Sequence, residues 1–411
     1  MEYFDTLETR DPEQRERELF AALPAQIAHA KANAPHFATR FADVDPHAIT
    51  SRRELAALPL TRKSEMHALQ QAAPPFGGLA AIAPSAAAKI FVSAGPIYEP
   101  EGKGPDYWRL ARALYAAGFR AGDVVQNCFS YHLSPAASML DGALLALGCP
   151  VIPGGTGQTE IQAQTIAQLG VVGYVGTPSF LKLILEKADE MKLAVGSLRK
   201  ALVSGEAFPP SLRDAWIARG IQAYQAYAIA DLGTVAYESA AREGLLVDEG
   251  LIVEIVRPGT GDPVPDGEVG EVVVTTFSRE YPLIRFATGD LSAVLPGRSP
   301  CGRTNMRIRG WMGRADQATK VRGLFVHPHQ IAEVIKRFPA IQRARVVVDN
   351  PDGNDRMRML CALTGGASQD LRSAIEEAVR DITRMRGEVE FVDLGLLPND
   401  GKVIEDVRKI V

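Results

Sequence analysis

Hydrophobic and polar positions at the start of the chain recur with a helical period. Residues 12–31 place apolar side chains three or four positions apart, which predicts an amphipathic helix. Two shorter helices are predicted over residues 51–58 and 61–69. Each opens with a hydroxyl residue, Ser51 or Thr61, and has a glutamate a few positions later that can complete a cap. We expect these helices to serve packing.

Beyond residue 106 the pattern changes to short apolar runs that alternate with helical segments. That rhythm is typical of βαβ units, in which parallel strands form a sheet and helices cover it. Residues 251–276 then alternate around Asp-Gly and Gly turns, which predicts hairpins. We therefore expect an α/β fold, with a large N-terminal part of mostly parallel sheets and helices plus a β-rich hairpin region. The alternating segments are 107–118, 122–125, 142–147, 151–152, 161–169, 171–175, 180–191 and 200–203.

The last quarter of the chain has the pattern of a small α+β unit. A length of 411 residues suits one large and one small domain. The predicted elements of the small unit are helices at 326–338 and 370–386 and strands at 344–348, 359–363 and 389–393.

Composition narrows the class of protein. Hydrophobic residues are 46% and charged residues 23% of the chain, as in an ordinary globular protein with a sizeable core. A net charge of −4 gives no reason to expect nucleic acid or an anionic membrane as a partner. The four cysteines are scattered without a CxxC pair, so we expect reduced thiols and no cysteine-rich metal site. No apolar run approaches the roughly 20 residues that span a bilayer, and the N-terminus lacks a signal-peptide core, so we expect a soluble cytoplasmic protein.

Candidate chemistry concentrates between Tyr281 and Gly323. Two carboxylates on glycine-containing turns, Asp290 and Asp316, precede the cations Lys320 and Arg322. A carboxylate can accept both hydroxyls of a ribose diol, and cations can bind phosphate oxygens. The alternative interpretation is two β-turns followed by a solvated charged strand.

Three short motifs in this stretch also resemble a known family. Thr288-Gly289-Asp290, Gly313-Arg314-Ala315-Asp316 and Val321-Arg322-Gly323 are similar, in this order, to core motifs of the adenylate-forming superfamily of acyl-CoA synthetases and adenylation domains. The flanking YPLIRFATGD and the N-terminal FATRFADVDPHAITSRRELAALPLTRKSEM resemble the phenylacetate–CoA ligase group, so the resemblance covers nearly the whole chain.

This resemblance implies an ATP-dependent acyl- or aryl-CoA ligase that forms an acyl-adenylate and transfers the acyl group to coenzyme A. It implies ATP or AMP, Mg²⁺ and coenzyme A as ligands, with a small, preferably aromatic, carboxylic acid as substrate. It also divides the chain into an N-terminal domain (1–315) and a small mobile α+β C-terminal domain (316–411), with a hinge near Asp316. A homodimer is left open.

The resemblance further assigns roles to single residues. Asp290 would bind the ribose hydroxyls, Tyr227 would stack on adenine, and Asp231 would be the acidic Mg²⁺ ligand. Lys402 resembles the mobile catalytic lysine, although a lysine near a C-terminus is otherwise a solvated side chain. The catalytic candidates are Lys402, Asp231 and His132; the cofactor-binding candidates are Ser93, Ser204, Gly205, Glu206, Tyr227, Asp290, Arg314, Lys320, Arg322 and Gly323.

The segment from Ser93 to Lys103 departs most from the family pattern. It stands where the family has a phosphate-binding loop, yet Pro96 removes a backbone donor, and Glu99 and Glu101 add negative charge near a triphosphate. Lys103 is the candidate replacement for the missing loop lysine. Ala230 and Asp231 likewise stand for the family's Thr and Glu. These departures motivate the alternative function, a non-ligase relative that binds a nucleotide or acyl-adenylate.

Two further sites keep alternative interpretations. His132, between Tyr131 and Leu133, is either a satisfied structural residue or a group beside the acyl carboxylate. The Gly-rich turn 154–159 is either a helix cap at Thr159 or a wall of the ligand pocket.

Overall fold

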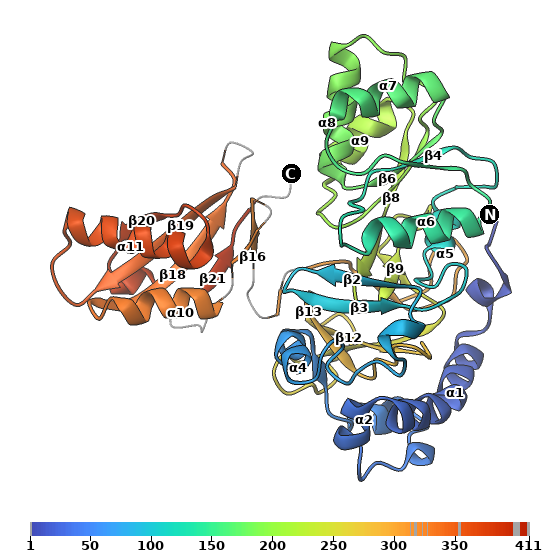
Figure 1. Ribbon diagram of the computed structural model, residues 1–411, viewed down its shortest axis with the longest axis horizontal. Coiled ribbons are helices and arrows are strands. Elements are labelled where there is room, and N and C mark those ends of the chain that lie inside the picture. The colour runs from blue at the N-terminus through green and yellow to red at the C-terminus, as the bar shows by residue number, and fades with distance from the viewer. Residues whose placement is uncertain are drawn as a thin grey trace. The chain divides into compact units, whose positions relative to one another are not determined.

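The computed structural model describes residues 2–312, 314–315, 319–322, 324–326, 328–351, 355–397 and 403–408. The chain forms two compact units, Met1–Met312 and Gly313–Val411 (Figure 1). The predicted hinge residue Asp316 lies outside the described residues, so its role stays a prediction.

The large unit is built on a nine-stranded sheet whose first five strands are parallel. In spatial order these are β5 (Val151–Pro153), β4 (Val125–Asn127), β6 (Gly173–Gly176), β7 (Lys200–Val203) and β8 (Gln222–Ile229). Antiparallel strands continue the sheet: β9 (Gly233–Tyr237), β10 (Leu245–Val247), β15 (Arg307–Ile308) and β14 (Val294–Leu295).

Helices cover both faces of the parallel strands, as the alternation of buried residues requires. Val175 and Leu202 pack in one apolar cluster with helices α5 (Ala111–Ala116) and α6 (Ala136–Ala146). Their neighbours Tyr174 and Ala201 pack in another with α7 (Thr159–Leu169), α8 (Pro178–Glu190) and α9 (Pro210–Ala218). Because successive strand residues point to opposite faces, this confirms the α/β prediction. Thr159 does not cap α7 as one interpretation held: Gln158 is the cap residue, with a left-handed backbone (φ 49°), and Thr159 is the first residue of the helix.

A second sheet and the N-terminal helices form the other half of this unit. The sheet has the order β1 (Thr61–Arg62), β13 (Phe286–Ser292), β12 (Gly270–Thr276) and β11 (Leu251–Val256), and β11 and β12 form the hairpin expected from the turn residues. Its core is shared with α1 (Pro12–Asn33) and α2 (Pro35–Arg40). The remaining helices are α3 (Arg52–Ala56) and α4 (Met66–Ala72), and single turns lie at Thr6–Thr9, Pro46–Ala48, Lys63–Glu65 and Pro84–Ala86.

The helix predicted to open at Thr61 is wrong in its first turn. Thr61 is fully buried and pairs with Phe286 in the parallel strands β1 and β13, and the helix begins only at Met66. The pairing partner lies more than 200 residues away in sequence, so no local pattern could have indicated it. Ser51, in contrast, caps α3 as predicted, accepting from the Arg53 amide at 3.2 Å.

The segment predicted as a poor phosphate loop is mostly a hairpin. Strands β2 (Lys89–Ser93) and β3 (Ile97–Glu101) pair antiparallel, so only residues 94–96 form a turn (Figure 1). Glu99 and Glu101 therefore sit on a strand rather than in a loop, and both are buried.

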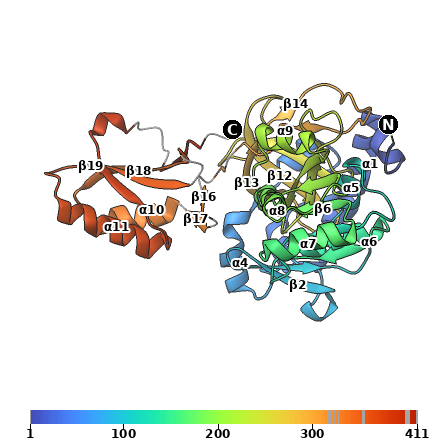
Figure 2. The same ribbon diagram turned by 90° about the horizontal axis from the view of Figure 1, so that it is seen from above.

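The small unit is an α+β fold, as its sequence pattern indicated. A four-stranded sheet has the order β20 (Glu388–Phe391), β19 (Arg356–Leu363), β18 (Ile341–Asp349) and β21 (Ile404–Asp406). Helices α10 (Pro328–Arg337) and α11 (Gln369–Thr383) lie on one face of it (Figure 2). A separate hairpin joins β16 (Thr319–Val321) and β17 (Leu324–Val326), and a single turn lies at Leu394–Leu396. All four cysteines of the chain are buried and free. Across the described part of the chain, no helix is long and apolar enough to cross a membrane.

Candidate active site

Three loops meet beyond the carboxyl ends of the parallel strands β4, β5 and β7, the edge at which α/β proteins bind ligands. A Cβ at Gly205, after β7, would lie 3.9 Å from the Phe129 ring, and one at Gly155, after β5, would lie 3.7 Å from the Tyr131 ring. Gly205 also has a left-handed backbone (φ 81°), which glycine adopts without a steric cost. The structure thus places the candidate loop of His132 beside the candidate loop of Ser204.

Hydrogen bonds anchor the 204–206 loop at both ends. The Ser204 hydroxyl donates to the Ala226 carbonyl on β8 at 2.7 Å. The Glu206 carboxylate accepts from the Ser179 amide at 3.2 Å, in the first turn of α8, where a negative charge is favourable. The loop is therefore held in a fixed position between β8 and α8.

The motif Thr288-Gly289-Asp290 forms a bulge in strand β13. These three residues face a single residue of β12, Val272, since the register passes from Ala287↔Val273 to Leu291↔Glu271. Gly289 has φ 76°, which favours glycine, and its amide donates to the Glu271 carboxylate at 3.1 Å. The Thr288 hydroxyl accepts from the Asp290 amide at 3.1 Å. The bulge fixes the direction in which the Asp290 side chain leaves the strand.

Asp290 and Tyr227 are hydrogen-bonded across the two sheets of the large unit. The Tyr227 hydroxyl donates to Asp290 Oδ2 at 2.8 Å, and the Trp311 indole donates to Oδ1 at 3.1 Å. Asp290 is 9% exposed, whereas the Trp311 ring is 47% exposed. The two residues predicted to bind adenosine are thus adjacent, although one is on β8 and the other on β13.

Two buried acidic residues interact electrostatically: Asp231, which follows β8, and Glu99 on β3. Asp231 and Glu99 are 3% and 0% exposed, and the Lys63 ammonium lies 2.5 Å from Asp231 Oδ2. The Ser93 hydroxyl donates to Glu99. Burial, and next the negative charge of Asp231, raises the pKa of Glu99 to about 8, against the opposing effects of the Ser93 hydrogen bond and the Lys63 charge. Within the described residues, Asp231 Oδ1 and Glu99 Oε2 have no hydrogen-bond partner.

Comparison with known proteins agrees with this geometry. Residues 110–278 match the AMP-binding enzyme family. The phenylacetate–coenzyme A ligase of Aromatoleum evansii is 30% identical over 81% of this chain and 78% of its own length. The enzyme of that name from Escherichia coli K12 is 27% identical over 99% of this chain and 98% of its own.

The chain belongs to the phenylacetate–CoA ligase group of the adenylate-forming enzymes.

It is accordingly an AMP-forming acid–CoA ligase that works through an acyl-adenylate. The crystal structure of 2-hydroxyisobutyryl-CoA ligase in complex with 2-HIB-AMP and CoA, in the thioesterification state, has the same fold. Its TM-score is 0.79 at 22% identity, and the match covers 98% of this chain and 92% of that one. The fold expectation is confirmed by this likeness.

Several residues at the site of this ligase were not singled out from the sequence. Lys63 was assigned only to a helix, and the signal that could have found it was a lysine inside the family-like PLTRKSEM segment. Trp311 immediately precedes Met312 and the Gly313 motif, and a single tryptophan beside a predicted turn is a weak signal. Glu99 was noted only as an unfavourable charge, because its partners Asp231 and Lys63 come from distant segments.

Arg285 directly precedes β13, the strand that carries Asp290 in this ligase. Its guanidinium pairs with Glu254 (Nε–Oε2 and Nη2–Oε1, both 3.1 Å) and also donates to the Ala56, Leu58 and Gly261 carbonyls at 2.6, 2.5 and 2.9 Å. Both charged side chains are buried. Arg285 therefore ties the start of β13 to two loops, and its partners could not be read from sequence.

The structure places the other described candidates only by their surroundings within their own unit. His132 is exposed, while the adjacent Leu133 carbonyl accepts from the Val92 amide of β2 at 2.9 Å. In the small unit, the Arg322 amide donates to the Asp355 carboxylate at 2.9 Å. Lys320 lies on β16 opposite Phe325. Arg314 belongs to the described residues, whereas Gly323 and Lys402 lie outside them.

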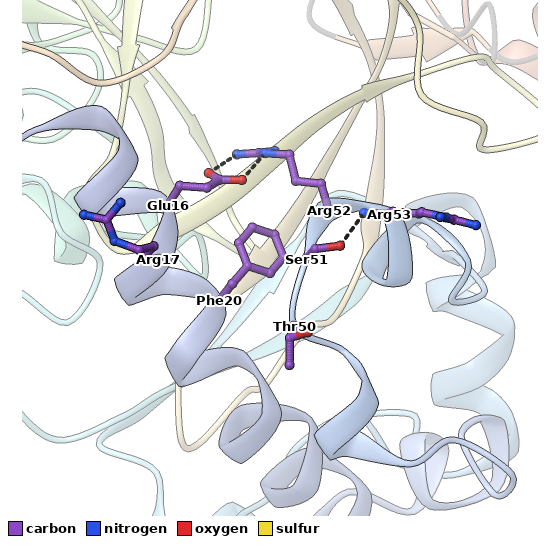
Figure 3. A pocket seen from close by; sticks show the side chains of 7 residues that line it. All are labelled: Glu16, Arg17, Phe20, Thr50, Ser51, Arg52 and Arg53. Atoms are coloured by element: carbon purple, nitrogen blue, oxygen red, sulfur yellow. Dashed lines mark hydrogen bonds and ion pairs between the residues drawn. The ribbon is translucent and has the colours of Figure 1, made fainter.

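A hollow of about 350 Å³ lies elsewhere, between α1 and the start of α3. Figure 3 shows that the side chains of Arg17 and Arg53 point away from each other, while Arg52 is paired with Glu16 at 2.7 Å. Its cations do not converge on one point, and none of the predicted site residues lines it. Its lining residues are Glu16, Arg17, Phe20, Thr50, Ser51, Arg52 and Arg53.

Proposed function

We propose that this ligase activates a small, preferably aromatic, carboxylic acid with Mg·ATP and then transfers the acyl group to coenzyme A. The observation that supports this most is the hydrogen bond between Tyr227 and Asp290, which pairs an aromatic ring suited to a base with a carboxylate suited to a ribose. The aromatic acid is favoured by the named substrate of the phenylacetate–coenzyme A ligase relatives.

In this proposal Asp290 binds the ribose while its existing partners keep it oriented. The Tyr227 hydroxyl and the Trp311 indole orient the carboxylate, whose oxygens are suited to accept the two ribose hydroxyls. The Tyr227 ring stacks on adenine, and the Ser204-Gly205-Glu206 loop lines the adenine side.

The acidic pair fits a divalent cation. Mg²⁺ prefers hard oxygen ligands, and Asp231 offers a buried carboxylate oxygen that has no other partner among the described residues. When bound, Mg²⁺ neutralises charge on the phosphates of ATP. The Lys63 ammonium, held beside Asp231, is placed to bind phosphate oxygens. It takes the role expected of a phosphate-loop lysine better than Lys103, which is exposed beyond the end of β3.

The acyl group is proposed to bind at the loop after β4. Phe129 and Tyr131 supply aromatic surface, and His132 on the same loop is exposed. The Tyr131 hydroxyl is held by Asp141 at 2.8 Å, so its ring is fixed rather than adaptable. A rigid aromatic wall suits a flat aryl substrate.

The small domain is proposed to serve both half-reactions by turning about Asp316. Lys402 would stabilise the charge that develops during adenylate formation, and Gly323 would let the backbone approach the pantetheine of coenzyme A. Two domain poses let one acyl site use two sets of groups. Arg314, Lys320 and Arg322 are the accompanying nucleotide-binding candidates. A cytoplasmic location and a homodimer also stay predictions.

The role of Lys402 is tested by separating the two half-reactions. Lys402→Ala should lose adenylate formation from ATP but keep thioester formation from a supplied acyl-adenylate. Lys336→Ala, which removes an exposed lysine on α10 of the same domain, is the matched control and should keep both. Equal loss of both steps in Lys402→Ala would contradict this role.

The function itself is tested by pyrophosphate release with Mg·ATP across a panel of aryl and short-chain carboxylic acids, with and without coenzyme A. Release that depends on one aryl acid, with turnover that requires coenzyme A, is the expected result. A preference for short-chain acids would overturn the aromatic substrate class. Silence across the panel, together with measurable AMP binding, would instead favour a nucleotide-binding relative without ligase turnover.

A further inference from the structure

The β2–β3 hairpin holds Glu99 in a fixed position beside Asp231. The neighbouring residue Tyr98 is bracketed by Gln70 of α4, whose side chain accepts from the Tyr98 amide and donates to its carbonyl, both at 2.8 Å. On the facing strand, Ser93 donates its hydroxyl to one Glu99 oxygen. A side chain held on both flanks in this way is suited to a ligand site that needs a set geometry.

Two buried oxygen atoms in this cluster have no hydrogen-bond partner among the described residues: Glu99 Oε2 and Asp231 Oδ1. Buried polar atoms in native proteins are nearly always satisfied. These two exceptions therefore indicate a bound species that accepts contacts from oxygen atoms.

The charges of the cluster indicate a cation. Lys63 pairs with Asp231, so an ionised Glu99 would add a buried negative charge, which is costly unless a cation balances it. Lys63 contacts Asp231 Oδ2 and leaves Oδ1 available, so a cation can bind without displacing it. The donor set consists of hard oxygen atoms, which Mg²⁺ and Mn²⁺ prefer.

We propose that Glu99 is a second carboxylate ligand of the divalent cation that Asp231 holds. This inference rests on the metal role proposed above for Asp231 and adds a residue from the hairpin that stands in place of the phosphate loop. Two carboxylates give the protein an affinity for the cation of its own. The enzyme then binds the cation in the absence of nucleotide, rather than receiving it only as a complex with ATP.

The test is a titration of the full chain with Mn²⁺ in the absence of nucleotide. The EPR signal of free Mn²⁺ reports how much of the added metal stays unbound. We expect wild-type protein to bind Mn²⁺ and Glu99→Gln to weaken that binding by at least about tenfold, since losing even an indirect metal partner commonly costs that much. Asp231→Asn should weaken it similarly. Glu99→Asp, which keeps the charge but withdraws the carboxylate by one methylene, should give an intermediate loss.

Glu101→Gln is the matched control. It makes the same chemical change two residues along the same strand, where the carboxylate is held by the Trp108 indole at 2.7 Å and the Ser138 hydroxyl at 3.0 Å. It should bind Mn²⁺ as wild type does. Near-ultraviolet circular dichroism of each variant checks that the fold is intact, and Glu99→Asp serves as the test if Glu99→Gln does not fold.

The outcomes separate this inference from the one it rests on. If Asp231→Asn loses Mn²⁺ while both Glu99 variants bind it as wild type does, Glu99 is not a ligand and the role of Asp231 stands. If wild-type protein binds no Mn²⁺, or if no variant differs from it, the cation site itself is overturned.

Discussion

Replacing Lys63 by methionine should destabilise the large unit and abolish pyrophosphate release. The Lys63 ammonium lies 2.5 Å from Asp231, whose side chain is 0% exposed, while the lysine side chain is 22% exposed. Removing one partner of a buried ion pair costs about 3–5 kcal/mol, because the other charge is left uncompensated. Since Lys63 is partly solvated, we expect the lower end of that range, about 3 kcal/mol.

Tryptophan fluorescence during urea unfolding is the measurement for this prediction. All three tryptophans, Trp108, Trp216 and Trp311, lie in the large unit, so the signal reports on that unit alone. The double variant Lys63→Met/Asp231→Asn should recover most of the lost free energy of unfolding, because the buried charge of Asp231 is then removed together with its partner. Pyrophosphate release should be lost in both variants.

Lys89→Met provides the matched control. Its ammonium lies 3.3 Å from Glu101, but its side chain is 55% exposed, so removing it should cost less than about 1 kcal/mol. If Lys63→Met is no more destabilising than Lys89→Met, or if the double variant is as unstable as the single one, the argument from burial is refuted.

Three further predictions concern the nucleotide site, the scaffold and the pH dependence. Tyr227→Phe keeps the ring but removes the donor to Asp290, so AMP binding measured by calorimetry should weaken about tenfold; an unchanged Kd would show that the hydroxyl does not matter. Arg285→Met leaves the buried Glu254 without its cation and should cost about 3–5 kcal/mol in urea unfolding, a prediction that a loss below about 1 kcal/mol would contradict. Burial, and then a neighbouring guanidinium, lowers the pKa of His36 from 6.5 to about 4, so the fold favours its neutral ring. The stability that the neutral His36 ring contributes is complete above pH 6.5 and is lost as the pH falls towards 4. Because one proton is involved, the unfolding constant should rise by at most about tenfold for each pH unit of that fall. His36→Gln should flatten the unfolding profile in that window, and an identical profile would count against the assignment.

Local patterns were sufficient for most of the secondary structure. The helical period at the start of the chain predicted α1, and the alternation of apolar runs and helices predicted the parallel strands β4 to β7 with their covering helices. These elements are visible in sequence because each buries a face that it displays within its own length. Thr61 shows the limit, since it was assigned to a helix by its neighbours but is a strand residue paired with Phe286.

For the candidate site, the sequence determined which residue types are available and only the tertiary structure decided which of them meet. The motif Thr288-Gly289-Asp290 was recognised through its resemblance to the family, whereas its place in a bulged strand, rather than on the expected turn, came only from the structure. The pairing of Lys63 with Asp231 joins residues 168 positions apart, and Glu99, whose pKa is shifted by both of them, comes from a hairpin that local reasoning treated as a loop. Such contacts follow from the packing of whole sheets and helices, and their energies depend on burial, which no short stretch of sequence specifies.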